Sequence, residues 1–199
     1  MNQSYIKLRA YRRDDLSWLC LLLNQGSARI SLGEFPAPLA EEQIHQRFSK
    51  PTSSHFQYMA ENQAGQLLGF FDITLTFKDR RGQLRWLFAP HPEEIQTRTG
   101  DSSADQITEP KLPSPLEESL RELLRRLFQE MNLNKCIVQI PAFQDPDLAI
   151  LQRAGFTQEA VLRDEVFYEG RYHDALLLGL LREELQNLKT PDLGSPRVD

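Results

Sequence analysis

The fold of this chain is decided by one stretch, residues 114–140: SPLEESLRELLRRLFQEMNLNKCIVQI. Ser114, Pro115 and Glu117 have the pattern of a helix start, in which the serine caps the helix, the proline takes the first helical position and the glutamate reaches back to the cap. Leucines at three- and four-residue spacing follow and predict a helix with one apolar face. The apolar run Lys135–Ile140 predicts a short buried strand directly after it.

Three strands are predicted before this helix. Phe56–Glu61, Leu67–Phe77 and Gln83–Phe88 are rich in aromatic and β-branched residues and are separated by short polar turns, which predicts an antiparallel meander. The helix then crosses over to Lys135–Ile140, so that strand should run parallel to Gln83–Phe88.

Periodicity and turn residues place further elements at both ends of the chain. They are a strand at 6–11, a helix with apolar residues at 16–23 that Asp14 or Asp15 is available to cap, a helix at 40–48, a helix at 145–153 that ends at Gly155, a strand at 156–168, a hairpin partner at 172–180 and a short helix at 181–188. The core order is β-α-α-β-β-β-α-β-α-β-β. This is an α/β (α+β) fold, with a mixed, mostly antiparallel twisted sheet flanked by helices.

The composition suits one domain. The chain has 199 residues, of which 40% are hydrophobic and 26% charged, and a chain of this kind buries a sizeable core. We expect a single domain over residues 1–189. Residues 89–113 hold prolines and polar residues without an apolar period, which predicts a long flexible insert. Residues 190–199 are expected to be a disordered tail.

Charge and residue usage exclude several classes of function. The formal net charge of −5 argues against a general nucleic-acid surface, which needs basic residues to neutralise phosphates, and is compatible with a cationic amine as partner. No segment is apolar and long enough for a membrane span, and the N-terminus lacks the apolar region of a signal peptide. We therefore expect a cytoplasmic protein. The two cysteines and four histidines form no metal-ligand pattern, so no metal is expected.

Four motifs, in this order and separation, resemble those of a known family. They are Leu8-Arg9-Ala10 with Asp14-Asp15-Leu16, Leu68-Gly69-Phe70, Leu151-Gln152-Arg153-Ala154-Gly155-Phe156, and Gly170-Arg171-Tyr172-His173-Asp174 leading into Leu178-Gly179-Leu180-Leu181. With the element order, they make the chain similar to the GNAT superfamily of N-acetyltransferases. Within it, the chain resembles the branch that modifies ribosomal-protein N-termini and polyamines.

The resemblance implies where acetyl-CoA binds. In the family two neighbouring parallel strands splay apart, and the cofactor lies in the gap. Its pantetheine arm pairs with the strand backbone, which corresponds here to Leu87, Phe88 and Ala89. The start of the crossover helix, here Ser114 and Leu116, receives the pyrophosphate through backbone N–H groups and the helix dipole.

The sequence departs from the family pattern in two places. The family has a glycine-rich turn before the crossover helix, whereas this chain has Leu112-Pro113-Ser114-Pro115. Proline has no N–H to donate, so we expect weak acetyl-CoA binding. The tyrosine that protonates the leaving thiolate in many members corresponds to Leu151. Members without it typically carry an asparagine at the position of Gln144, which is therefore a candidate for both cofactor binding and catalysis.

Three further residues are candidates for deprotonating or contacting the acceptor amine. Asp72 shares a strand face with Phe70 and Thr74, where a carboxylate can deprotonate an amine through water; the alternative is a partly solvated strand residue. Glu34 lies in the loop that lines the acceptor site in the family; the alternative is a solvated loop acid. Tyr172 belongs to the matching hairpin and is a candidate for substrate contact; the alternative is a structural role.

Three hypotheses about function follow. The first is transfer of an acetyl group from acetyl-CoA to a primary amine of a small molecule or peptide. The second is an inactive GNAT-fold binding or scaffold protein that no longer binds acetyl-CoA. The third is an acyltransferase with a different donor. Whether the chain forms a homodimer is left open.

Overall fold

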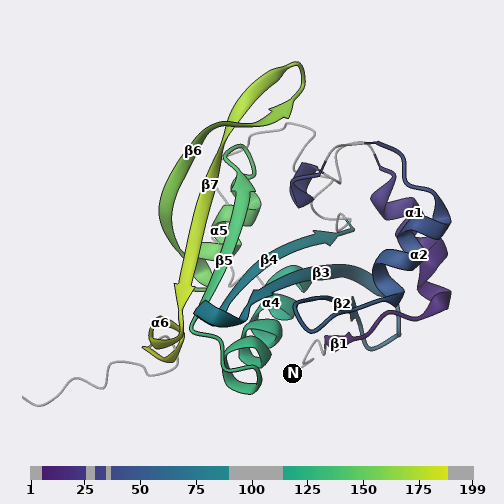
Figure 1. Cartoon of the computed structure of the whole chain (residues 1–199), viewed down its shortest axis with the longest axis horizontal. Helices are drawn as coiled ribbons and strands as arrows, with labels where there is room; N and C mark the ends of the chain where they lie inside the picture. Colours follow the sequence, from purple (N-terminus) through teal and green to yellow (C-terminus); the bar gives the residue numbers. More distant parts are fainter. Residues whose placement is uncertain (1–5, 26–29, 35–36, 90–113, 188–199) are drawn as a thin grey trace, which may run out of the picture.

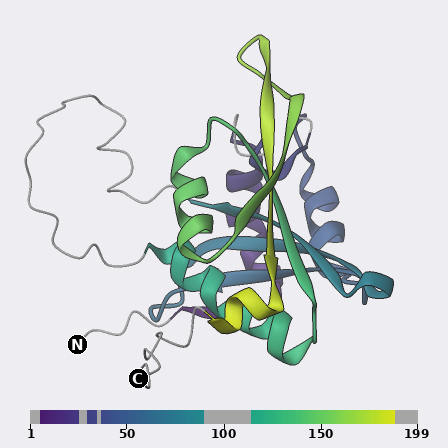
Figure 2. The same ribbon diagram turned by 90° about the vertical axis from the view of Figure 1, so that its left-hand side faces the viewer.

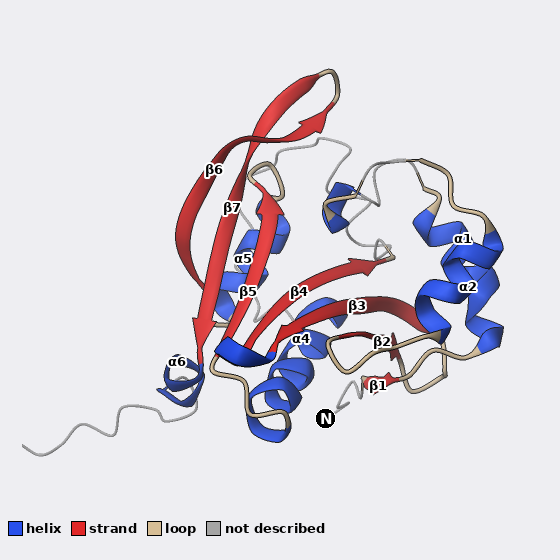
Figure 3. Ribbon diagram, in the orientation of Figure 1, coloured by secondary structure: helices blue, strands red, loops and turns tan. Residues whose placement is uncertain are grey.

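A computed structural model describes residues 6–25, 30–34, 37–89 and 114–187. The insert predicted after Ala89 and the predicted tail lie outside the described residues. The described elements follow the predicted order (Figures 1 and 3). They are β1 (Lys7–Arg9), η1 (Arg13–Asp15), α1 (Leu16–Leu23), η2 (Ile30–Leu32), α2 (Glu41–Ser49), β2 (His55–Glu61), β3 (Leu67–Thr76), η3 (Phe77–Asp79), β4 (Arg81–Phe88), α4 (Pro115–Arg125), the π-helical segment η4 (Arg126–Glu130), β5 (Lys135–Pro141), α5 (Asp145–Arg153), β6 (Thr157–Tyr168), β7 (Arg171–Leu181) and α6 (Arg182–Asn187).

One sheet joins the strands of the described chain, in the order β1-β2-β3-β4-β5-β7-β6. Neighbouring strands are antiparallel, except that β4 and β5 are parallel. This confirms the predicted mixed, mostly antiparallel sheet and the parallel pair on either side of the crossover helix.

The sheet separates two apolar cores. Residues of α4 and α5 pack on one face, and residues of α1 and α2 pack on the other (Figure 2). Alternate side chains of β3 enter different cores. Phe71 and Ile73 belong to the core under α4, whereas Phe70 belongs to the core under α1 and α2. Both faces of β3 are buried from Gly69 to Ile73, because side chains alternate across a sheet that is covered on each side there.

The start of α4 confirms part of the predicted cap. The Glu117 N–H donates to Ser114 Oγ at 3.2 Å, and Pro115 takes the first helical position. The carboxylate of Glu117 was predicted to reach back to the cap, but it accepts a hydrogen bond from Arg153 Nη2 at 2.9 Å and lies 3.6 Å from Arg121 Nη2. Two nearby guanidinium groups therefore hold the side chain that the capping pattern assigned to the helix start.

The cap predicted for α1 is also different. Asp15 precedes α1, but its carboxylate does not cap that helix. It accepts two hydrogen bonds of 2.8 Å from the Arg9 guanidinium and one of 2.7 Å from the Arg12 N–H. A bidentate ion pair is stronger than a neutral cap, so Asp15 joins β1 to the first turn and leaves α1 without a side-chain cap.

Strands β4 and β5 separate towards their carboxyl ends (Figure 1). In the described chain they pair only from Arg81 opposite Lys135 to Leu84 opposite Val138. Strand β4 then continues to Phe88 and β5 continues to Pro141. The backbone edges of the two strand ends beyond this pairing face a gap, which we call the β4–β5 split.

Strand β6 bends where it passes this region. Its register with β7 shifts between Leu162 and Val166, and Asp164 has φ 53°, in the left-handed region. The Asp164 N–H donates to Asp174 Oδ1 at 3.0 Å, which fixes the bent backbone. Such bulges redirect side chains next to functional sites.

Candidate active site

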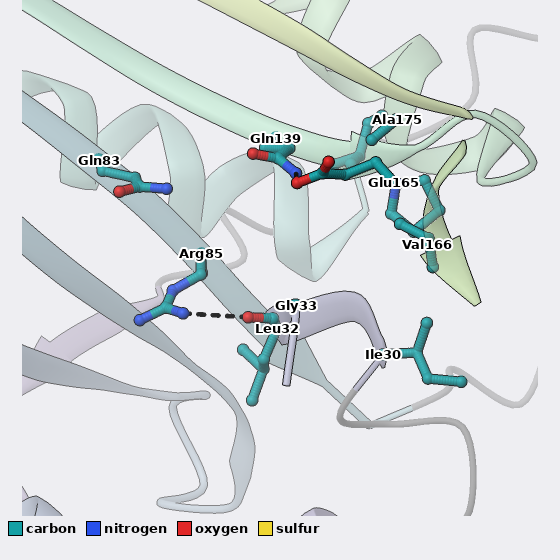
Figure 4. Close-up of a pocket in the computed structure, with 11 residues that line it drawn as sticks. Ile30, Leu32, Gly33, Gln83, Arg85, Gln139, Glu165, Val166 and Ala175 are labelled. Carbon is teal, nitrogen blue, oxygen red and sulfur yellow. Dashed lines mark hydrogen bonds between the residues drawn. The ribbon is translucent and has the colours of Figure 1, made fainter. Parts of the chain in front are cut away.

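A cavity of about 220 Å³ opens beside the β4–β5 split (Figure 4). Four segments line it: the middle of β4, the end of β5, the η2 turn and the bulge of β6, together with Ala175 of β7. Residues far apart in the sequence therefore form one concave surface at the place where two strands end, which is the common location of a small-molecule site.

The polar groups of the cavity come from three strands. Gln83 and Arg85 project from β4, Gln139 from β5 and Glu165 from the bulge of β6. Gln139 Nε2 donates to Glu165 Oε1 at 3.4 Å. Apolar side chains make up much of the remaining lining: Ile30, Leu32, Ile140, Pro141, Val166 and Ala175.

Asp72 lies next to this cavity and is 1% exposed. Its Oδ1 accepts a hydrogen bond from Gln57 Nε2 at 2.8 Å and lies 2.8 Å from His55 Nε2. Its Oδ2 accepts hydrogen bonds from Arg85 at 2.9 Å and Arg47 at 3.2 Å. The alternative of a partly solvated strand residue is therefore wrong: Asp72 is the buried centre of a charged cluster.

The surroundings of Asp72 decide its acidity. Burial alone would raise the pKa of its carboxyl group, but the positive charges of Arg47 and Arg85 and the Gln57 hydrogen bond outweigh burial and hold that pKa below its ordinary value. A carboxylate with a low pKa whose oxygens are both occupied accepts protons poorly. The predicted role of Asp72 as general base stays a prediction, and its contacts favour a positioning role.

The two arginines on Asp72 also hold the η2 turn. Arg85 Nη1 donates to the Leu32 carbonyl oxygen at 3.1 Å (Figure 4). Arg47 Nη1 lies 2.8 Å from Glu34 Oε1. Asp72 thus orients two side chains that fasten one wall of the cavity to the sheet. Glu34, predicted to contact an amine, has its carboxylate in this ion pair.

The residues predicted to pair with pantetheine lie at the end of β4, on the split. Leu87 is buried in the core under α1 and α2, and the Phe88 ring packs 5.2 Å from that of Phe71. A Cβ on Gly69 would come within 2.4 Å of the Phe88 ring, so the glycine lets this ring approach the β3 backbone closely. The Ala89 N–H donates to the Leu68 carbonyl on the β3 side.

The start of α4 offers few donors to a phosphate. Pro115 has no N–H, the Glu117 N–H is bound to Ser114 Oγ, and the Glu118 N–H is bound to the Ser114 carbonyl. Among the described residues at this helix start, the N–H groups of Ser114 and Leu116 are left to donate to an anion. Glu117 and Glu118 also place two carboxylates in the first turn, where they occupy the positive end of the helix dipole.

The remaining predicted residues are placed as follows. Gln144 directly precedes α5 in the turn after β5, and its N–H donates to the Pro141 carbonyl at 3.1 Å. Leu151 is fully buried in the core and carries no proton to give. Tyr172 is 63% exposed on the β6–β7 hairpin, with its ring 5.1 Å from that of Phe167.

Several site residues were not singled out from the sequence. Gln83 and Arg85 alternate with apolar residues on β4, so their common face was readable from the strand pattern. Arg47, His55 and Gln57 come from two other elements and meet only around Asp72. No sequence signal places them together.

The described residues contain neither a membrane-spanning helix nor a cluster of metal ligands. None of the described helices has the length and apolar character needed to cross a membrane. No group of three or more His, Cys, Asp and Glu side chains in the described ranges is arranged to hold a metal ion.

The fold type follows from this architecture. A mixed sheet that splits between two parallel strands, with a crossover helix between them and a cavity at the split, is the GNAT acetyltransferase fold. The spermidine N-acetyltransferase of Vibrio cholerae, crystallised with CoA and spermine, superimposes with a TM-score of 0.75 over 92% of this chain and 98% of that chain, at 19% identity. A chimera of the same enzyme with hSSAT gives a TM-score of 0.73 over 92% and 99%, also at 19% identity.

The sequence itself has a more limited match. The SPbeta prophage-derived uncharacterized N-acetyltransferase YokL of Bacillus subtilis is 30% identical over 70 residues, which cover 35% of this chain and 40% of that protein. The matched segment thus spans less than half of either protein. No family model matches the chain. The structural neighbours show that the chain has the GNAT fold, and the sequence match makes part of the chain similar to an N-acetyltransferase.

Proposed function

We propose that this protein transfers an acetyl group from acetyl-CoA to a primary amine. The observation that carries the proposal is the β4–β5 split with a cavity open beside it. The free edge of β4 supplies backbone groups that an extended amide-containing chain such as pantetheine can pair with. The cavity supplies a place for an amine next to that edge.

The reaction that fits this arrangement is direct acyl transfer. The amine nitrogen forms a bond to the carbonyl carbon of the thioester, the bond from that carbon to sulfur breaks, the nitrogen loses a proton and the thiolate gains one. The geometry contributes chiefly by holding the two reactants together, an effect that lowers a barrier substantially without a strong acid or base.

Two residues have supporting roles in this proposal. Gln144, in the turn after β5, supplies a side-chain amide that donates a hydrogen bond to a developing thiolate, although an amide does not release its proton near neutral pH. Asp72 orients Arg47 and Arg85, and through them the η2 turn. Asp72 is therefore proposed as a positioning residue.

The choice of acceptor rests on related proteins and on the cavity. The enzyme from Vibrio cholerae is named as a spermidine N-acetyltransferase, which supports a primary amine of a small molecule as the acceptor. A primary amine of a peptide is the second candidate for the acceptor, because it reacts with the thioester in the same way. The cytoplasmic location and pairing with a second copy stay predictions from the sequence.

A transfer assay tests the proposal. With acetyl-CoA at millimolar concentration and a mixture of primary amines, we expect acetylated amine in the mass spectrum and an equal amount of free thiol. Gln144→Ala should lower the turnover rate by about tenfold, because one hydrogen bond to a charged group is lost. Gln152→Ala, an exposed change on the same helix, should leave the rate unaltered. If no amine is acetylated, the proposed function is wrong.

A further inference from the structure

The charges around the cavity define an acceptor more narrowly than the fold does. Among the described residues that line it, Glu165 is the one carboxylate and Arg85 the one guanidinium. The lining therefore offers an anionic partner to one positive charge, at Glu165, while the charge of Arg85 is paired with Asp72. A cavity of about 220 Å³ also falls below the range of about 300–1,000 Å³ that drug-sized ligands occupy.

The backbone places the Glu165 carboxylate at this site. Glu165 lies inside the register shift of β6 between Leu162 and Val166, next to Asp164 in its left-handed conformation. The Asp174 carboxylate fixes the Asp164 N–H, so the bend is held from the neighbouring strand. Glu165 thus reaches the cavity, where Gln139 donates to it (Figure 4).

The opposite charge is fixed in place. Arg85 is held by Asp72 Oδ2 at 2.9 Å and by the Leu32 carbonyl at 3.1 Å, so its guanidinium cannot swing away from a cationic ligand. Apolar side chains also line the cavity, among them Ile30, Ile140 and Val166. A second ammonium group in this space would meet an ion-paired guanidinium and apolar side chains, and it would lose hydration without gaining an anionic partner.

We propose that Glu165 is the residue that receives the ammonium group of the acceptor, and that this acceptor is a small monoamine with an apolar body, not a polyamine. The inference rests on the proposed acetyl transfer, because it assigns the specificity of the same site. Glu165 binds the cationic nitrogen, Gln83 and Gln139 line the same cavity with amide groups, and the described lining holds no second carboxylate for a second cation. The hydrocarbon part of the acceptor packs on the apolar lining.

Two amines of different charge test the specificity. Isoamylamine carries one ammonium group on a branched hydrocarbon, and spermidine carries three cationic nitrogens. We expect kcat/KM for isoamylamine to exceed that for spermidine by about tenfold or more, which is the effect of about one repelled or unpaired charge. A higher kcat/KM for spermidine would overturn the monoamine proposal.

A matched pair of variants tests Glu165 itself. Glu165→Gln removes the charge at constant size, and we expect the Kd of isoamylamine to rise about tenfold and KM to rise with it, while kcat changes little. Glu169→Gln makes the same change at the tip of the same hairpin, outside the cavity, and should leave both constants unaltered. Equal Kd values for Glu165→Gln and the unaltered protein would overturn the role of Glu165.

The binding measurement separates this inference from the proposed function. Ligand-detected NMR measures isoamylamine binding without acetyl-CoA, so it reads the site whether or not acetyl transfer occurs. Binding that depends on Glu165, without any acetyl transfer, would support the amine site and contradict the proposed acetyltransferase activity. Transfer to isoamylamine that does not depend on Glu165 would support the activity and overturn this assignment of the site.

Discussion

Replacing Asp72 with alanine is expected to lower the free energy of unfolding by about 3–5 kcal/mol, the cost of breaking a buried ion pair by removing one partner. The carboxylate is 1% exposed and compensates Arg47 and Arg85. Without it, two guanidinium groups remain next to each other with less negative charge between them. Chemical denaturation of the two proteins under the same conditions measures the difference.

An exposed aspartate provides the control for this change. Asp79 lies at the surface in η3, and Asp79→Ala should change the free energy of unfolding by no more than about 0.5 kcal/mol. Asp72→Asn keeps the volume and removes only the charge, so it should fall between the two. A loss below about 1 kcal/mol for Asp72→Ala would mean that Asp72 does not organise the cluster.

Acetyl-CoA is expected to bind this chain about two to four powers of ten more weakly than it binds an acetyltransferase with a glycine-rich phosphate turn. Two backbone donors of such a turn are lost, since Pro115 has no N–H and the Glu117 N–H is committed to Ser114. Hydrogen bonds to charged groups contribute about 1.5–3 kcal/mol each, and 1.4 kcal/mol corresponds to a factor of ten in Kd.

Acetyl-pantetheine separates the two halves of the donor site. It keeps the arm that pairs with β4 and lacks the phosphates. Because the start of α4 contributes little, calorimetric titration should give Kd values for acetyl-pantetheine and acetyl-CoA within about tenfold of each other. A low-micromolar Kd for acetyl-CoA, with a much weaker Kd for acetyl-pantetheine, would show that the phosphates are well held after all.

Much of the fold was predictable because it is encoded locally. The leucine spacing of 116–131 and the apolar alternation of the strands each depend on neighbouring residues, and both gave the correct element type. The parallel pairing of β4 and β5 was predictable as well, since a crossover helix constrains the direction of the strand that follows it. The ends of the elements agree to within about two residues, the usual uncertainty of such boundaries.

The site was less predictable because it depends on contacts between distant residues. The face of Asp72 was predicted correctly from the alternation of β3, but its burial depends on partners from β2, β4 and α2. Glu165 owes its direction to a bulge whose register shift has no signal in the sequence. The carboxylates predicted to cap α1 and α4 have arginine partners instead: Arg9 binds Asp15, which also accepts the Arg12 N–H, and Arg153 binds Glu117.

The central claim is that the β4–β5 split holds the acetyl donor, and hydrogen–deuterium exchange tests it most directly. With acetyl-CoA at saturating concentration, we predict slower exchange of the backbone amides at the end of β4, from Arg85 to Phe88, because the donor arm pairs with that edge and covers it. The first strands of the sheet, β1 and β2, serve as the internal control and should not change. Unchanged exchange at Arg85–Phe88, with protection elsewhere or nowhere, would contradict the account.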